Sequence, residues 1–273
     1  MDNQNTTPYW HITINIYISI IIHILTQHMK NEPIKWYIGF DMDDTLADTW
    51  VLHWEFQEHI LKQYGVHDIT RALVSAQFAW VSTHTRIAQI LDDRSKTYNK
   101  TELIDLISQK NNFIGEKIKN REVQLMPGAL ITITQLFEDG YRMGISSGSP
   151  RELIEAFLTA FDLRRLIPTC TSTYDEGIQG KPAPDVFTNT FDNLDIIYGH
   201  ETKSPRFIKM GVGDWVKDVI SAHQAGADKT FWIPHPIMQD HIAAELKQLQ
   251  EDWYNPILIK DLKEIHTTIS TIL

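Results

Sequence analysis

Two aspartates, separated by one residue, follow a short hydrophobic stretch of the chain. The stretch 34–40 is aromatic and β-branched, which is typical of a strand buried on both faces, and Asp41 lies at its carboxyl end. Open parallel sheets bind ligands beyond the carboxyl ends of their strands. Asp41 could therefore attack a phosphorus atom and help to hold a divalent cation, while Asp43 could protonate the leaving oxygen. A polar turn is the alternative, because Asp and Thr are common loop residues.

Two later stretches carry groups suited to holding a phosphate. Ser147 and Gly148 follow a predicted strand, and a hydroxyl with exposed backbone N–H groups at a strand-to-helix turn can bind phosphate oxygens. These residue types are also routine at helix N-termini. Lys181 is followed by two prolines within three residues, which stiffen the backbone so that the ammonium group can be aimed with little loss of entropy. A solvated loop lysine is the alternative.

A second pair of carboxylates ends another predicted strand. Asp214 follows that strand directly, and Asp218 lies one helical turn further on, so both side chains can face one cleft. Mg²⁺ is commonly held by one or two carboxylates and keeps water and substrate oxygens as its other ligands. The pair therefore predicts a magnesium site. The alternatives are a helix N-cap for Asp214 and a solvated helix face for Asp218.

Together these motifs resemble those of the haloacid dehalogenase superfamily of phosphohydrolases, in the same order along the chain. The resemblance runs from about Trp36 to the end of the chain. The family motifs are D-x-D-x-T, a Ser or Thr that ends a strand, a Lys in K-P-x-P-D, and G-D-x-x-x-D. They match, in that order, Asp41, Asp43 and Thr45; Ser147; Lys181; and Gly213, Asp214 and Asp218.

The resemblance implies a reaction through an aspartyl-phosphate, with Asp41 as nucleophile and Asp43 as acid and base. It implies that Lys181 offsets the charge between Asp41 and the phosphate. The substrate-binding residues that it implies are Thr45, Ser147, Gly148, Lys181 and His53. The implied ligands of Mg²⁺ are Asp41, the backbone carbonyl of Asp43, Asp214, and Asp218 directly or through water.

Within this family a phosphatase acting on a small phosphorylated metabolite is favoured. The dehalogenase branch has no second Asp at the place of Asp43, and the phosphonatase pattern replaces it. A phosphosugar mutase stays open, because Thr49 and His53 match the start of the β-phosphoglucomutase cap. Trp80 and Thr83 stand where that enzyme has Gly and Arg, which weakens this assignment. A non-catalytic binding protein on the same scaffold is the third alternative.

The stretch 50–125 is predicted to form a helical cap like that of the phosphoglycolate phosphatase and β-phosphoglucomutase branch. No β-rich run interrupts it, and apolar residues recur at helical spacing over 50–64, 69–80, 85–91 and 101–119. Its tryptophans could line the cleft between cap and core or fill the cap's own interior: Trp50, Trp54 and Trp80. Its arginines could meet a distal anion of the substrate or lie on solvated faces: Arg71, Arg86 and Arg94.

The stretches 29–49 and 126–273 are predicted to form the core, an α/β domain with a Rossmann-like parallel sheet and helices on both faces. Short strands and helices alternate along the second stretch, which implies parallel strands with helical crossovers. The predicted strands are 141–147, 166–171, 207–213, 229–233 and, at an edge, 256–259. The predicted helices are 129–137, 150–161, 185–193, 216–224 and 240–251.

Composition narrows the choice of partners and compartment. The formal net charge of −10 repels nucleic acid and anionic membranes. Cys170 is the one cysteine, so no intrachain disulfide can form, which fits a cytoplasmic protein. The Ile-rich stretch 12–25 is short for a membrane span and has no basic start, and residues 1–28 are expected to be a dispensable extension. A monomer or a homodimer is expected.

Overall fold

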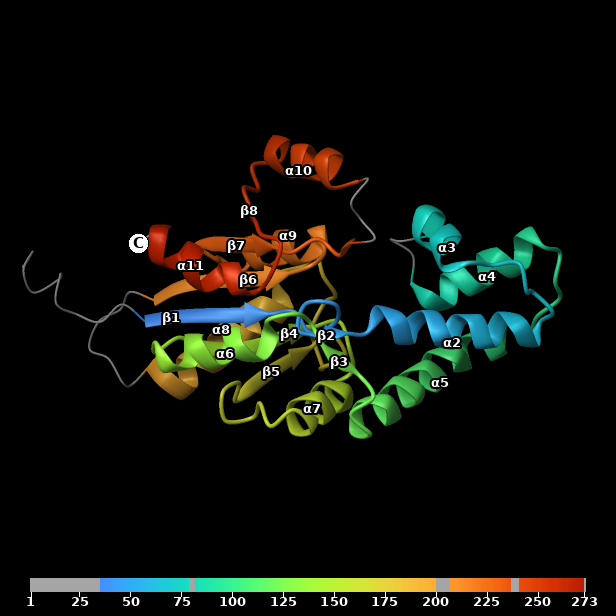
Figure 1. Cartoon of the computed structure of the whole chain (residues 1–273), viewed down its shortest axis with the longest axis horizontal. Coiled ribbons are helices and arrows are strands. Elements are labelled where there is room, and N and C mark those ends of the chain that lie inside the picture. Colours follow the sequence, from blue (N-terminus) through green and yellow to red (C-terminus); the bar gives the residue numbers. More distant parts are fainter. Residues whose placement is uncertain (1–34, 79–81, 200–206, 237–240, 273) are drawn as a thin grey trace, which may run out of the picture.

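The computed structural model describes residues 35–78, 82–199, 207–236 and 241–272. A parallel sheet with helices on both faces forms the larger part, and a lobe of helices extends from one end of it (Figure 1). The prediction of a dispensable extension over residues 1–28 and the proposals for Trp80 lie outside the described residues. No helix in the described part of the chain has the length and apolar character needed to cross a membrane.

The six strands of the sheet lie in the order β5-β4-β1-β6-β7-β8, and every neighbouring pair is parallel. Their bounds are β1 (Lys35–Phe40), β4 (Arg142–Ser147), β5 (Thr169–Ser172), β6 (Phe207–Gly213), β7 (Lys229–Trp232) and β8 (Ile257–Leu258). The last residue of β1, Phe40, pairs with Ile145 of β4 on one side and Val212 of β6 on the other. The carboxyl ends of these three strands therefore lie side by side.

Alternation along β1 assigns its side chains to the two faces of the sheet. Ile38 and Phe40 join the hydrophobic cluster formed with helices α6 (Ala129–Glu138), α7 (Arg151–Ala160) and α11 (Lys263–Ile272). Tyr37 points to the other face, where it packs with α8 (Asp185–Tyr198) and α9 (Val216–Gln224). All three side chains are fully buried, so β1 is the centre of the core.

Glycines on β6 allow α9 to lie unusually close to the sheet. A Cβ atom on Gly211 would lie 2.2 Å from the Cβ of Ala222 on α9. A Cβ on Gly213 would lie 2.3 Å from the Cβ of Asp218, in the first turn of the same helix. Because atoms cannot approach so closely, only glycine at these two positions lets α9 hold Asp218 against the end of β6.

The helical lobe consists of α2 (Trp50–Gln63), α3 (Arg71–Phe78), α4 (Thr83–Asp93) and α5 (Lys100–Lys119). Its helices share a hydrophobic cluster of their own, which includes Phe56, Ile60, Ile87 and Leu106. The chain leaves and re-enters the core through a short antiparallel pair, β2 (Ala47–Asp48) and β3 (Gln124–Leu125). We refer to the lobe as the cap.

Helix α5 belongs to both parts of the molecule. Leu106, in its first half, packs in the cap cluster, whereas Ile114 and Ile118 pack in the cluster of the core. Gly115 lies against α7, where an added Cβ would be 3.0 Å from the Leu153 side chain. The end of the cap is therefore packed against the core along a helix.

The predicted fold class, an α/β parallel sheet with an inserted helical cap, is confirmed. Strand β8 lies at the edge of the sheet, as predicted. Helix α10 (Ile242–Glu251) also falls where a helix was predicted. Two features were not predicted, the β2–β3 pair and the C-terminal helix α11.

Candidate active site

A cavity of ≈ 280 Å³ lies where the carboxyl ends of the central strands face the cap. The core contributes, among others, Asp41 after β1, Lys181 from the loop before α8, and Asp214 after β6. The cap contributes Trp50 and His53 from α2, Arg86 from α4 and Lys110 from α5. The core side of the wall therefore carries the carboxylates, together with lysines, and the cap side carries basic groups without a carboxylate among the lining residues.

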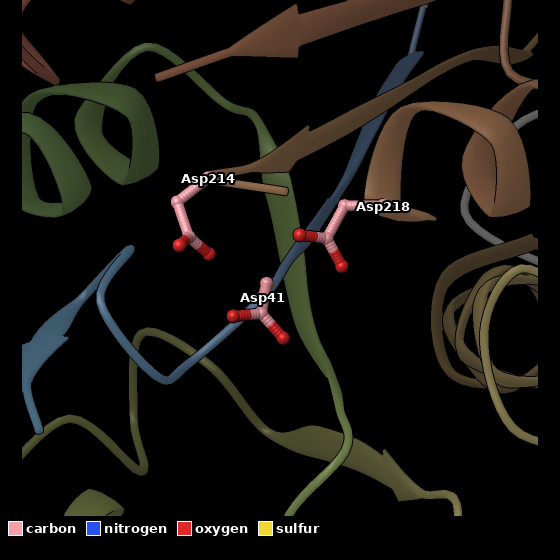
Figure 2. A group of neighbouring side chains, drawn as sticks. All are labelled: Asp41, Asp214 and Asp218. Carbon is pink, nitrogen blue, oxygen red and sulfur yellow. The ribbon is translucent and has the colours of Figure 1, made fainter. Parts of the chain in front are cut away.

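Three carboxylates converge at the core side of the cavity. Asp41 follows β1, whereas Asp214 and Asp218 follow β6, and Figure 2 shows the three carboxylates grouped together. One oxygen from each lies within 4.8 Å of the other two, and all three residues are buried. The alternatives of a polar turn and a solvated helix face do not fit this burial, and Trp215, not Asp214, is the N-cap residue of α9.

Lys181 links two of these carboxylates. Its Nζ lies 2.6 Å from an oxygen of Asp41 and 2.6 Å from an oxygen of Asp218. Burial alone would lower the pKa of the Lys181 ammonium, but the carboxylates of Asp218 and Asp41 outweigh it and raise the pKa above the ordinary value. Lys181 is therefore a fixed positive charge, so the alternative of a solvated loop lysine is wrong for this residue.

Burial raises the pKa of both Asp41 and Asp214 well above the ordinary value of 3.8, and neighbouring carboxylates add to the effect. One lysine cannot neutralise three carboxylates. The Oδ2 atom of Asp214 is buried and has no hydrogen-bond partner in the described part of the chain. Its other oxygen accepts a hydrogen bond from the Thr45 hydroxyl at 3.3 Å. An unpartnered buried carboxylate oxygen beside a second carboxylate fits a hard divalent cation such as Mg²⁺.

Asp43 is half-buried and points to a different partner set. Its Oδ2 accepts hydrogen bonds from the hydroxyls of Ser149 at 2.6 Å and Ser147 at 3.4 Å. The Ser147 hydroxyl in turn accepts a hydrogen bond from the backbone N–H of Ser149. Of the four predicted catalytic residues, Asp41, Asp43 and Lys181 thus line the same cavity, whereas Ser147 lies behind Asp43 as its hydrogen-bond donor.

The remaining predicted substrate-binding residues are placed differently from one another. Gly148 and His53 line the cavity. Thr45 and Ser147 are fully or almost fully buried. The Thr45 hydroxyl donates a hydrogen bond to Asp214, and the Ser147 hydroxyl donates one to Asp43.

Three basic groups of the cap approach the cavity: His53, Arg86 and Lys110. Burial lowers the pKa of Arg86 to about 10 and, with the charge of Lys110, lowers that of His53 to about 4. Burial also lowers the pKa of Lys110. The Arg86 guanidinium lies over the Trp50 ring, 5.4 Å from its centroid. At neutral pH the cap therefore presents two partly desolvated cations and a neutral imidazole, a setting that favours a bound anion.

Several cap residues considered from the sequence lie elsewhere. Trp54 packs against the cap's own hydrophobic cluster. Arg94 pairs with Asp68 on the exposed side of the cap, at 2.9 Å. Arg71 is exposed and does not line the cavity. Trp50 and Arg86 are the members of those two sets that reach the cavity in the described part of the chain.

Some cavity residues were missed by the sequence reasoning. They include Asp44, Lys110, Lys217 and the hydroxyl of Ser149. Asp44 stands at a variable position of the D-x-D-x-T motif, so the motif gives it no role. Lys110 lies in a long amphipathic helix, and nothing in its spacing shows which polar position faces the core.

A family model described as haloacid dehalogenase-like hydrolase matches residues 38–231. Protein CbbY of Rhodobacter capsulatus is 26% identical over 166 residues, which are 57% of this chain and 70% of that protein. The match to the family model begins in β1, ends in β7 and includes every motif residue discussed above.

Solved structures of similar shape include two named relatives. One is a CbbY variant from Rhodobacter sphaeroides in complex with xylulose-(1,5)bisphosphate, with a TM-score of 0.63, 20% identity, and coverage of 84% of this chain and 95% of that chain. The other is described as a predicted phosphoglycolate phosphatase from Haemophilus somnus, with a TM-score of 0.64, 20% identity, and coverage of 85% and 97%. These likenesses show the shared fold.

Proposed function

The chain belongs to the haloacid dehalogenase-like hydrolase family, and we propose that it is a Mg²⁺-dependent phosphatase that forms an aspartyl-phosphate on Asp41. The observation that carries the proposal is the convergence of Asp41, Lys181 and Asp214 beside a separately held acid, Asp43. Phosphoryl transfer needs in-line positioning and positive charge on the phosphoryl oxygens more than it needs further covalent chemistry. These side chains supply that combination.

In the proposed reaction the Asp41 carboxylate attacks the phosphorus and the bond to the leaving oxygen breaks. Asp43 gives a proton to that oxygen, and in the second half it takes a proton from the water that attacks the aspartyl-phosphate. Lys181, held beside Asp41, offsets the charge that gathers between carboxylate and phosphoryl group. Gly148 lines the cavity after β4, and we propose that its N–H donates to a phosphoryl oxygen, while the hydroxyls of Ser147 and Ser149 hold Asp43.

The metal site that we propose uses Asp41, Asp214 and the backbone carbonyl of Asp43, with Asp218 bound directly or through water. A bound Mg²⁺ would supply positive charge to the phosphoryl oxygens. Asp218 is held in place by two contacts, one oxygen on Lys181 and the other on the backbone N–H of Trp215 at 2.9 Å. The Thr45 hydroxyl orients Asp214 by donating a hydrogen bond to its Oδ1.

We propose further that the substrate carries a second anionic group, a phosphate or a carboxylate, which meets Arg86 and Lys110. Both residues line the same cavity as Asp41, and burial weakens the hydration of both charges. The relative from Rhodobacter sphaeroides was solved with a bisphosphate, which supports this substrate class.

The phosphatase proposal is tested with purified protein, Mg²⁺ and a panel of phosphorylated metabolites alongside p-nitrophenyl phosphate. We expect release of inorganic phosphate, and loss of at least about 10³-fold in rate for Asp41→Asn, since no nucleophile remains. Asp192→Asn, an exposed change on α8, is the matched control and should keep full activity. A folded wild-type protein that releases no phosphate across the panel would contradict the proposal.

The second anion is tested by comparing KM for substrates with one and two anionic groups. Arg86→Gln should raise KM for a bisphosphate or a phosphocarboxylate by about 10- to 100-fold, because one hydrogen-bonded charge contact to the substrate is lost. The KM for p-nitrophenyl phosphate, which has no second anion, should change little. Equal effects on both substrates would show that Arg86 only supports the cap.

A phosphosugar mutase is the second candidate, favoured by the place of His53. This residue lies on α2 at the cavity, and its Nδ1 is buried without a partner in the described residues. A mutase would isomerise a sugar phosphate with no net release of phosphate and would depend on a bisphosphate activator. Product analysis by ³¹P NMR with and without the activator separates the two reactions.

A further inference from the structure

The residue next to the proposed acid, Asp44, turns its side chain toward the start of the cap. Its Oδ1 accepts hydrogen bonds from the backbone N–H of Trp50 at 2.7 Å and of Thr49 at 3.0 Å. The Thr49 hydroxyl lies 3.4 Å from the same oxygen. Asp44 is buried, with 8% of its surface exposed. One carboxylate oxygen therefore binds the residues at which the chain enters helix α2.

Helix α2 depends on this carboxylate for its N-terminal cap. The N-cap residue Thr49 makes no side-chain capping bond, and the first turn of α2 contains no acidic residue. The first N–H groups of a helix lack partners within the helix and carry partial positive charge. Asp44 supplies a hydrogen-bond acceptor to two of them from outside the helix.

The same turn fixes the position of Asp43. The backbone N–H of Asp44 donates to the carbonyl of Ala47 at 2.7 Å, and the N–H groups of Leu46 and Ala47 donate to the carbonyl of Met42. Asp44 adopts φ 58°, a left-handed conformation in which glycine is the least strained residue. Asparagine and aspartate tolerate it better than other side chains do. A glycine at this place would relieve the backbone and remove the bond to α2.

We propose that Asp44 is a positioning residue that couples the acid/base carboxylate of Asp43 to the placement of the cap. Asp43 and Asp44 are adjacent in one hydrogen-bonded turn but have different partners. Asp43 accepts hydrogen bonds from the serines at the end of β4, and Asp44 accepts them from the start of α2. Trp50 and His53, both on α2, line the cavity. A shift of that helix is therefore transmitted to the residue beside the acid. This inference rests on the proposed phosphatase function for its kinetic consequence and on the contacts alone for its structural one.

The kinetic test compares two aryl phosphates that differ in their need for an acid. Phenolate is a poor leaving group that requires a proton, whereas p-nitrophenolate leaves with little assistance. Asp44→Gly should lower kcat for phenyl phosphate by about tenfold or more and kcat for p-nitrophenyl phosphate by much less, since a misplaced Asp43 loses part of its acid catalysis. Asp44→Asn keeps an oxygen acceptor and should keep both rates within about threefold, because a neutral acceptor retains most of a capping bond.

Asp162→Gly is the matched control. Asp162 also has a left-handed backbone, φ 56°, but its side chain is exposed and remote from the cavity. Its replacement should leave the ratio of the two kcat values unchanged. A wild-type ratio in Asp44→Gly would overturn the coupling and leave Asp44 as an ordinary turn residue.

A measurement independent of activity separates this inference from the proposed function. Hydrogen–deuterium exchange over peptides that contain Thr49 and Trp50 should be faster in Asp44→Gly than in wild type, Asp44→Asn or Asp162→Gly. Unchanged exchange would overturn the inference even in an active enzyme. If the wild-type protein hydrolyses neither aryl phosphate, the phosphatase proposal fails, and the exchange data still decide whether Asp44 holds the cap.

Discussion

Burial decides the charge of the groups around the cavity, and His53 shows it most simply. Its imidazole has no hydrogen-bond partner for Nδ1 in the described residues, and it lies near Lys110. Burial and that neighbouring charge lower its pKa from 6.5 to about 4. His53 is therefore neutral at physiological pH, and it can accept a proton or a hydrogen bond from a substrate hydroxyl.

The lowered pKa of His53 makes the stability of the folded protein depend on pH. Between about pH 6.5 and 4 the unfolded chain binds a proton at His53 that the folded chain refuses, so stability falls as the pH drops through this window. His53→Gln removes the effect. Its melting temperature should therefore fall less than that of wild type between pH 7 and pH 5, by the equivalent of about 1–2 kcal/mol.

Differential scanning fluorimetry at the two pH values measures this difference. His67→Gln, at an exposed cap position, is the control and should follow the wild-type curve. A His53→Gln protein with the acid sensitivity of wild type would show that the imidazole is more hydrated than its surroundings indicate.

Much of the candidate site was accessible from the order of residue types. Asp41, Asp43, Lys181 and Asp214 could be assigned because strand ends in a parallel sheet converge, whatever the details of packing. The partners of Asp43 could not, because serine hydroxyls at a helix start serve equally well as caps. The cationic cap residues Arg86 and Lys110 depend on how the cap is placed over the core, and local spacing does not determine that placement.

At the scale of elements, the close approach of α9 to β6 sets the position of Asp218. Gly211 lies in the middle of β6 against Ala222, and a methyl group at that place has no room. The packed interior can respond only by moving the helix, and α9 carries Asp218 in its first turn. Packing between these two elements is thus part of the geometry of the carboxylates.

Gly211→Ala should destabilise the protein by about 1–3 kcal/mol and weaken Mg²⁺ binding, because overpacking moves α9 away from the sheet. Chemical denaturation gives the first quantity and calorimetric titration of Mg²⁺ the second. Gly180→Ala is the control, since an added Cβ at Gly180 meets no atom within 4 Å. Loss of stability with unchanged Mg²⁺ affinity would show that Asp218 does not depend on this contact.

The elements that sequence reasoning missed are those whose local pattern gives a mixed signal. Helix α11 is rich in Ile and Thr, which favour strands, yet Ile265 and Ile269 are spaced four residues apart and pack in the core cluster. Tertiary packing overrides the local preference there. The strands β2 and β3 contain two residues each, and such a pair forms only because the chain must leave and re-enter the core at one place.

Considered as a whole, the molecule carries a net charge of −10 but gathers cations on the cap side of its cavity. A phosphorylated ligand must therefore be attracted locally against the overall field. A divalent cation on the core side reduces this repulsion and also relieves the crowding of Asp41, Asp214 and Asp218.

Mg²⁺ should raise the melting temperature, by the equivalent of about 2.7 kcal/mol at 100 times its Kd. The pKa values of Asp41 and Asp214 are raised, so protons compete with the cation, and the Mg²⁺-induced increase should be larger at pH 8 than at pH 5.5. Asp214→Asn should lose most of this increase, and Asp192→Asn should keep it. An increase of equal size in K⁺ at matched ionic strength would indicate screening instead of a site.

The double membership of α5 affects how this protein could be recombined with its relatives. A cap exchanged at the β2–β3 pair would bring a foreign helix with it, and Ile114, Gly115 and Ile118 would no longer fit against Leu153 and its neighbours. Leu52 of α2 also packs in the core cluster, so a chimera joined within α5, between Leu106 and Ile114, and within α2, after Leu52, would leave these residues in their own clusters. Substrate preference could then be transplanted by splices inside two helices, and the chain entering the cap from Asp48 would keep its native junction.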